Sequence, residues 1–311
     1  MPSRNVRILN FDDSVTSQKG LVARFSPEII DLRDLAPRAR FWLNPECKNI
    51  IQGRLKDSRK DAVTFLGSGD FHHITGILVG GFSEKACVIS FDLHPDWTVL
   101  SPLLSCGSWV TAALKKKKNV VKVILLGSSS LDTSIFSLYA GDLGSLKNDR
   151  VEIYPYSQHP STVFFRKVPD NISFDIKRGP FFTRIFWNEL NSKNLVEFFL
   201  HVMKRLPSKK VYLTIDKDCL KKEYAATNWQ EGRMSLDELL LMIKLIKDNT
   251  EIVGADITGD YSEISVDGAV KKIFSRMNHP RENTAGNLQE AFITQVNEET
   301  NLRILDTLST S

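Results

Sequence analysis

The chain has 311 residues, of which 42% are hydrophobic and 25% charged, a balance typical of globular proteins that excludes disordered and fibrous classes. Its formal net charge of +4 is small for this length and predicts no nucleic-acid partner, because nucleic-acid binding usually needs a concentrated basic face. Four cysteines without a CxxC pair, no signal-peptide pattern and no apolar run of membrane-spanning length predict a cytoplasmic protein without a disulfide scaffold or membrane span.

Short apolar runs rich in β-branched residues alternate along the chain with helix-like stretches. Strands are expected at 6–11, 62–67, 86–92, 120–127, 151–156, 210–216 and 251–257, and the clearest helices at 192–206, 235–249 and 287–308. Most strand runs are continuously apolar, which is typical of parallel strands covered by helices on both faces. The pattern predicts an α/β fold, with residues 1–311 forming a single domain around a mainly parallel β-sheet. Residues 128–186, rich in Ser, Gly, Pro and aromatic residues, are expected to form an irregular, loop-rich insertion.

Ligand-type side chains follow four of the expected strands at the point where each strand ends. In open parallel sheets the carboxyl ends of the strands form the functional edge, so these side chains are expected to meet there. In chain order they are Asp70, His72 and His73, then Asp92, His94 and Asp96, then Asp216 and Asp218, and finally Asp256 and Asp260.

Carboxylates crowded in a dry site need a compensating positive charge, because each desolvated ion costs several kcal/mol or so unless it is paired. Lys217 is the only cation close to these strand ends, and strand alternation points it away from Asp216 and Asp218. One or two divalent cations are therefore the better compensation. Mixed imidazole and carboxylate ligands favour manganese, iron, zinc or nickel over calcium.

The order of these motifs resembles the arginase/agmatinase (ureohydrolase) family, of which this chain would be a divergent member. That family holds two manganese ions with a Gly-Gly-Asp-His motif, an Asp-x-His-x-Asp motif and a later Asp-x-Asp motif. Asp92, His94 and Asp96 match the middle motif at full spacing, and Asp216 and Asp218 match the last. The segment "GSGDFHH" has one residue more between Asp and His, which makes His72 the first choice of ligand and His73 the second. "ATNWQEGRMSLDELL" is similar to the family's Thr-x-x-x-x-Gly-Gly turn, and the resemblance spans roughly residues 62 to 260.

The resemblance implies a three-layer α/β/α fold and two divalent ions, Mn²⁺ first, with Fe, Zn or Ni as alternatives. Asp92 and Asp216 would bridge the ions, His72 and His94 would bind separate ions, and Asp96 and Asp218 would complete the two ligand sets. The implied activity is hydrolysis of a C–N bond in a small guanidine, amidine or linear amide by a metal-bridging hydroxide. Asp218 would hydrogen-bond that hydroxide, and the general acid would be His73, His159 or His279. His201 is expected to be a packed helix residue.

Two departures from the family pattern fall in the substrate region. Where the family offers a histidine, this chain has "CGSW", so Cys106, Ser108 and Trp109 are predicted to shape the substrate pocket. A catalytic thiol is disfavoured because no histidine partner is evident. Where arginases carry a guanidinium-binding Glu, this chain has Gly259 followed by Asp260, which becomes the candidate to receive a cationic group.

The alternative hypothesis is a non-catalytic binding protein that retains the metal on the same fold. A phosphate-handling enzyme is disfavoured because the sequence has no P-loop and no GxGxxG motif. The hydrolase hypothesis and the binding-protein hypothesis both predict a small-molecule ligand and no membrane partner. Both are compatible with a homo-oligomer.

Overall fold

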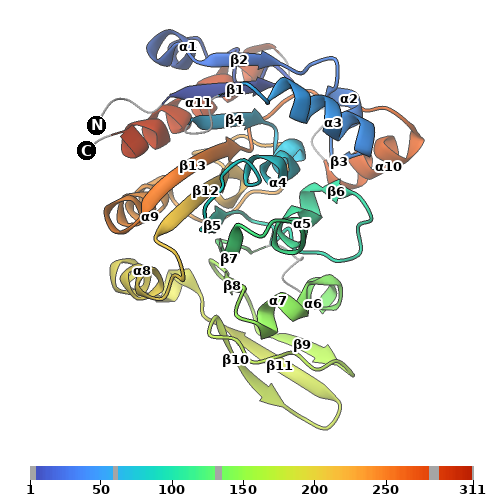
Figure 1. The fold of residues 1–311 in the computed structure, drawn as a ribbon, viewed down its shortest axis with the longest axis vertical. Helices are drawn as coiled ribbons and strands as arrows, with labels where there is room; N and C mark the ends of the chain where they lie inside the picture. Colours follow the sequence, from blue (N-terminus) through green and yellow to red (C-terminus); the bar gives the residue numbers. More distant parts are fainter. Residues whose placement is uncertain (1–4, 59–61, 130–134, 280–286, 310–311) are drawn as a thin grey trace.

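A computed structural model describes residues 5–58, 62–129, 135–279 and 287–309, and its centre is an eight-stranded sheet (Figure 1). The strand order is β2-β1-β4-β13-β12-β5-β7-β8, and every neighbouring pair is parallel. This arrangement confirms the predicted α/β fold. The strands are β1 (Val6–Asn10), β2 (Glu28–Asp31), β4 (Val63–Gly67), β5 (Ala86–Phe91), β7 (Val120–Leu126), β8 (Val151–Tyr154), β12 (Lys210–Asp216) and β13 (Glu251–Thr258).

Helices cover both faces of the sheet and make a single three-layer domain. One face packs against buried side chains of α1 (Lys19–Phe25), α8 (Leu195–Lys204), α9 (Leu236–Asn249) and α11 (Asn287–Ser309). The other packs against α2 (Ala36–Ala39), α3 (Pro45–Arg54), α4 (Thr75–Leu78), α5 (Trp109–Lys116), α6 (Ile135–Ala140) and α7 (Leu143–Lys147). A capping box between Ser235 and Glu238 fixes the start of α9. In the described part of the chain, no helix combines the length and apolar character needed to cross a membrane.

The described parts of residues 128–186, namely 128–129 and 135–186, are more regular than the predicted loop-rich insertion, so that expectation was wrong. They contain α6, α7, β8 and most of a three-stranded antiparallel sheet of order β10-β11-β9, formed by β9 (Ser161–Phe164), β10 (Phe174–Arg178) and β11 (Phe182–Trp187). This sheet lies at the end of the molecule away from β1 and β2 (Figure 1). Buried and more exposed side chains alternate along β11, the pattern of a strand with one face in the core.

The remaining elements are short and lie mostly around the carboxyl ends of the main strands. They are β3 (Trp42–Leu43), β6 (Leu104–Ser105), α10 (Ala269–Asn278) and the 3-10 helices η1 (Gly69–Ile74), η2 (Cys106–Ser108), η4 (Leu190–Ser192) and η5 (Lys217–Cys219).

Candidate metal centre

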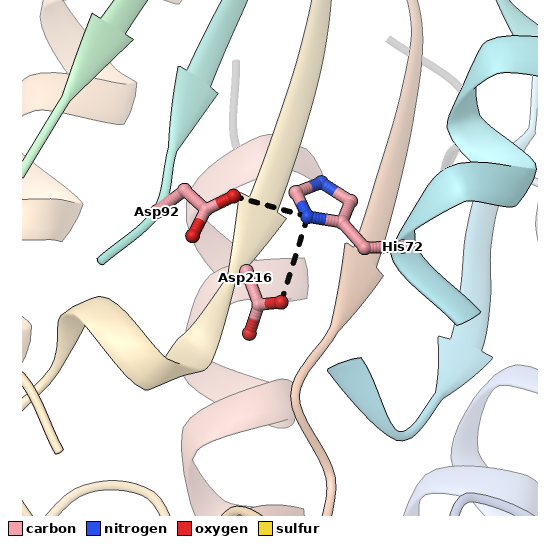
Figure 2. A group of neighbouring side chains, drawn as sticks. All are labelled: His72, Asp92 and Asp216. Atoms are coloured by element: carbon pink, nitrogen blue, oxygen red, sulfur yellow. Dashed lines mark ion pairs between the residues drawn. The ribbon is translucent and has the colours of Figure 1, made fainter. Parts of the chain in front are cut away.

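Three strands that lie close together in the sheet deliver a histidine and two carboxylates to one point. β5 pairs with β12 up to Phe91 and Ile215, so the residues that follow, Asp92 and Asp216, leave the sheet side by side. His72 comes from η1, directly after β4. Its ring points between the two carboxylates, with Nδ1 3.1 Å from Asp92 Oδ2 and 3.5 Å from Asp216 Oδ2 (Figure 2). These three side chains form the first candidate ligand group.

A second candidate ligand group adjoins the first and shares Asp92 with it. His94 Nδ1 lies 2.8 Å from Asp218 Oδ2 and 3.7 Å from Asp92 Oδ1. The two oxygens of Asp92 therefore face two different histidines, so both candidate groups share this carboxylate. In each group, one ligand atom per residue can be chosen so that all lie within 4.8 Å of one another. Asp96 lies next to the first group, with its Oδ2 3.2 Å from His72 Nδ1.

His72 and His73 follow one another on a 3-10 turn, so their side chains point about 120° apart. His72 faces the carboxylates, whereas His73 lies outside both ligand groups. Both ring nitrogens of His73 are buried without a hydrogen-bond partner among the described residues. Burial lowers the pKa of His73 to about 3, so its ring is neutral. The structure therefore places His72, the first choice of ligand, beside the carboxylates, and it places His73, the second choice, outside both groups.

A buried hydrogen-bond chain sets which nitrogen of His72 faces the carboxylates. Thr214 Oγ1 donates to Asp256 Oδ1 at 2.6 Å, so its oxygen is left to accept from His72 Nε2 at 2.9 Å. With the proton on Nε2, the lone pair of Nδ1 points into the cluster, as a metal ligand requires. Asp256, one of the strand-end carboxylates, therefore stands behind the ligands. It also accepts hydrogen bonds from Thr75 and Tyr212.

The cluster contains more carboxylates than compensating cations, and the raised pKa values of its carboxyl groups reflect this imbalance. Burial, followed by the charge of Asp96, raises the pKa of Asp92 to about 6. Burial and the charge of Asp218 raise the pKa of Asp216 well above its usual range. Burial opposes a charged His72, but hydrogen bonds to Asp92 and Asp96 raise the pKa of this histidine well above its usual value. Divalent cations would supply the missing charge, and the donor set of imidazole nitrogens and carboxylate oxygens fits them.

These raised pKa values predict how pH changes the stability of the metal-free protein. Asp92 and His72 both hold protons more tightly in the folded chain, so both stabilise it at low pH. The Asp92 contribution is full below its ordinary pKa of 3.8 and is lost as pH rises through about 6. That of His72 is full below 6.5 and is lost at higher pH. Melting temperatures in chelator should therefore fall between about pH 5 and about pH 8.

The metal-loaded protein should behave in the opposite way, because cations bind the deprotonated ligands. The increase in melting temperature on adding Mn²⁺ should grow over the same pH range. A metal-free melting temperature that rises towards pH 8 would contradict the assignment. The paired carboxylates Asp31 and Asp34 have lowered pKa values, which keeps their titration below this window.

A cavity of about 240 Å³ opens onto the ligand cluster. Besides the ligands, its walls are formed by Gly69, Cys106, Gly107, Trp229, Phe274 and Asn278. The Trp229 ring lies 5.2 Å from the His94 ring, and its Nε1 donates to Asp70 Oδ1 at 2.8 Å. The cavity therefore combines a polar floor with two aromatic walls.

Of the three residues predicted from "CGSW" to shape the pocket, one lines the cavity and two lie behind it. Cys106 is in the wall, and burial raises the pKa of its thiol well above the usual value, which disfavours a thiolate. Ser108 is buried in a hydrogen-bonded pair with Ser105, their hydroxyl oxygens 2.8 Å apart. Trp109 is fully buried, and its Nε1 donates to Asp96 Oδ2 at 2.7 Å. Trp109 therefore fixes the Asp96 carboxylate and has no face open to a substrate.

Asp260 does not line the cavity, and its predicted role in holding a cationic substrate group is corrected. It is fully buried, and its Oδ1 accepts from Lys217 Nζ at 2.9 Å and from Gln18 Nε2 at 2.7 Å. Lys217 points away from the metal-site carboxylates, as strand alternation predicts. The neighbouring Gly259 has a φ of 89°, and a Cβ there would come within 2.5 Å of Asp216 Oδ1. This backbone therefore has no room for the family's glutamate.

None of the three histidines considered as general acid lines the cavity. His279 is buried with Nε2 3.0 Å from Asp70 Oδ1, and Arg40 Nη1 holds the other oxygen of that carboxylate at 2.7 Å. His159 is exposed on the loop before β9.

His201, which was not a general-acid candidate, is exposed on α8, so the expectation that it packs inside was wrong.

Three wall residues, Trp229, Phe274 and Asn278, were not predicted from the sequence. Trp229 lies within the "ATNWQEGR" turn, and its position there is the only signal that could have identified it. Gly232 of the same turn has no room for a side chain, because a Cβ would collide with the backbone of Cys219. Phe274 and Asn278 come from α10, where no motif marks them.

Comparison with known proteins now decides the family. A model of the arginase family matches residues 26–259. The chain belongs to the arginase family. A protein of Thermotoga maritima described as uncharacterized is 26% identical over 260 residues, which cover 82% of this arginase-family chain and 80% of that protein.

Solved structures of the same fold have low sequence identity to this arginase-family chain. Arginase from Entamoeba histolytica in complex with L-ornithine is 10% identical, with a TM-score of 0.57, covering 99% of this chain and 100% of the other. Arginase from Bacillus cereus is 11% identical, with a TM-score of 0.54 and coverages of 97% and 98%. A hypothetical agmatinase from Burkholderia thailandensis is 14% identical, with a TM-score of 0.52 and coverages of 98% and 87%. At these identities the likeness shows the shared fold.

Proposed function

We propose that the chain is a hydrolase of a C–N bond that works with two divalent cations, Mn²⁺ first. The observation that carries the proposal is Asp92, whose two oxygens face the Nδ1 atoms of His72 and His94. One ion would be held by His72, Asp92, Asp96 and Asp216, and the other by His94, Asp92, Asp216 and Asp218. The family implies Asp216 as the second bridging carboxylate. Its Oδ1 accepts from the Asp218 amide at 3.1 Å, which keeps these two carboxylates together.

Bound cations would lower the pKa of water and polarise the bond to be cleaved. The side chains of the protein orient the reacting groups and handle protons. Burial raises the pKa of Asp218 even though His94 lowers it, which makes this carboxylate a better proton acceptor than an exposed one. The Leu93 amide donates to Asp218 Oδ1 at 3.0 Å, which holds this carboxylate in place.

The cavity walls favour a neutral substrate over a strongly cationic one. Trp229 and Phe274 offer aromatic surface, and Asn278 offers an amide that can both donate and accept a hydrogen bond. Among the described residues, every carboxylate that lines the cavity belongs to the proposed ligand set. Linear amides therefore rank ahead of amidines and guanidines as substrates.

The second candidate is a metal-retaining binding protein without turnover. It is favoured by one specific observation: no histidine outside the proposed ligand set lines the cavity in the part of the chain that the structure describes. Hydrolysis would then depend on another proton donor for the leaving amine.

Metal content and turnover together test the proposal. Protein purified without chelator should contain about two divalent ions per chain and should release ammonia or an amine from at least one linear amide, amidine or guanidine. Two bound ions without turnover across such a panel would favour the binding protein. Protein with no bound metal and no gain in melting temperature from added Mn²⁺ would refute both candidates.

A further inference from the structure

A second cavity, of about 220 Å³, lies towards the opposite end of the sheet. Its floor consists of residues near the amino ends of the parallel strands: Arg7 of β1, Thr64 of β4, Tyr212 of β12 and Val253 of β13. Residues of α3 and of the turn after α4 form its walls. The metal ligands follow the carboxyl ends of the same sheet, so the two cavities are separate sites.

Two cationic side chains face this second cavity. The guanidinium of Arg7 is almost fully buried and is fixed by donating to Ser58 Oγ and Thr64 Oγ1, each at 2.7 Å. Lys117 is half-buried, and burial together with the charge of Lys48 lowers its pKa. Among the described residues, Lys117 forms no ion pair. Its ammonium lies over Gly80, where a Cβ would collide with Nζ.

The rest of the second cavity is suited to a small apolar or planar group. The rings of Phe82 and Tyr212 stack with centroids 5.9 Å apart and planes 24° apart, and both line the cavity. Leu55 and Val253 add aliphatic surface. Cationic groups beside apolar walls are the features that recognise an organic anion.

We propose that this cavity binds a small organic carboxylate, whose charge faces Arg7 and Lys117 and whose apolar body lies against Phe82 and Tyr212.

Benzoate is a suitable probe, with benzamide as its uncharged analogue. In calorimetric titrations benzoate should bind the metal-free wild-type protein and benzamide should not. Lys117→Gln should weaken benzoate binding about tenfold, because it removes a charge-assisted contact. Lys116→Gln is the matched control: Lys116 is the last residue of α5, directly before Lys117, and it is exposed and does not line the cavity, so affinity should stay within about twofold. Lys117→Arg, which restores the charge, should recover most of the binding.

Two results would overturn the anion site: no benzoate binding by the wild type, or equal affinity in Lys117→Gln. Benzoate should also bind Asp92→Ala at wild-type affinity, which separates this cavity from the metal centre. Loss of binding there would assign benzoate to the metal-site cavity instead.

Discussion

Replacing Asp92 with alanine is expected to remove both cations, so that metal content falls from about two ions per chain to almost none. The reason is geometric, because Asp92 is the residue shared by the two ligand groups. The same change should raise the melting temperature of the metal-free protein. Burial already disfavours a charged Asp92, and the charge of Asp92 in turn raises the pKa of Asp216. A variant that loses metal yet gains metal-free stability cannot be dismissed as misfolded.

Substitution of other candidate ligands should remove one ion and leave the second bound. Asp96→Gly should lose the ion beside His72, and glycine suits the φ of 45° at that position. Asp218→Ala should lose the ion beside His94. Asp175→Ala, on exposed β10, should keep both ions. Loss of a single ion from Asp92→Ala would show that this residue does not bridge.

Replacing Lys217 with methionine should destabilise the protein by about 3–5 kcal/mol, measured by urea unfolding. Lys217 and Asp260 are both fully buried, and the change leaves the Asp260 carboxylate without its cation. Burial already raises the pKa of Asp260 against the effect of Lys217, so the unpaired carboxylate would take up a proton as part of the response.

The double variant Lys217→Met/Asp260→Leu should recover much of this loss, because replacing both partners leaves no buried charge. Asp260→Asn should lower stability while leaving Mn²⁺ affinity and KM close to wild type. A raised KM in Asp260→Asn without loss of stability would instead support the substrate role predicted from the sequence.

The strand ends were predictable because a buried parallel strand appears in the sequence as a continuous apolar run whose end can be located. A continuous apolar run ending in Asp or His gives the location of a ligand to within a residue or so, and parallel pairing brings such ends together. The choice between His72 and His73 needed the structure, because both follow β4 and only the 3-10 turn decides which ring faces the carboxylates.

Packing partners could not be predicted, because they come from segments far apart in the chain. From the sequence alone, Trp109 and Trp229 could each have lined a pocket. In the structure Trp109 is buried and hydrogen-bonded to Asp96, whereas Trp229 lines the cavity. Asp260 follows a strand as the ligands do, but Gln18 and Lys217 hold it elsewhere. The strands within 128–186 were missed because turn-forming residues separate short runs that each bury one face only.

The two tryptophans that contact the metal centre give each half of it an optical reporter. The Trp109 ring lies 5.1 Å from the His72 ring, and the Trp229 ring lies 5.2 Å from the His94 ring. A paramagnetic ion such as Mn²⁺ would quench the fluorescence of the indole beside the position it occupies. The chain has five tryptophans, so a variant that keeps only Trp109 and one that keeps only Trp229 would together make the order in which the two positions fill visible during a titration, without any attached label.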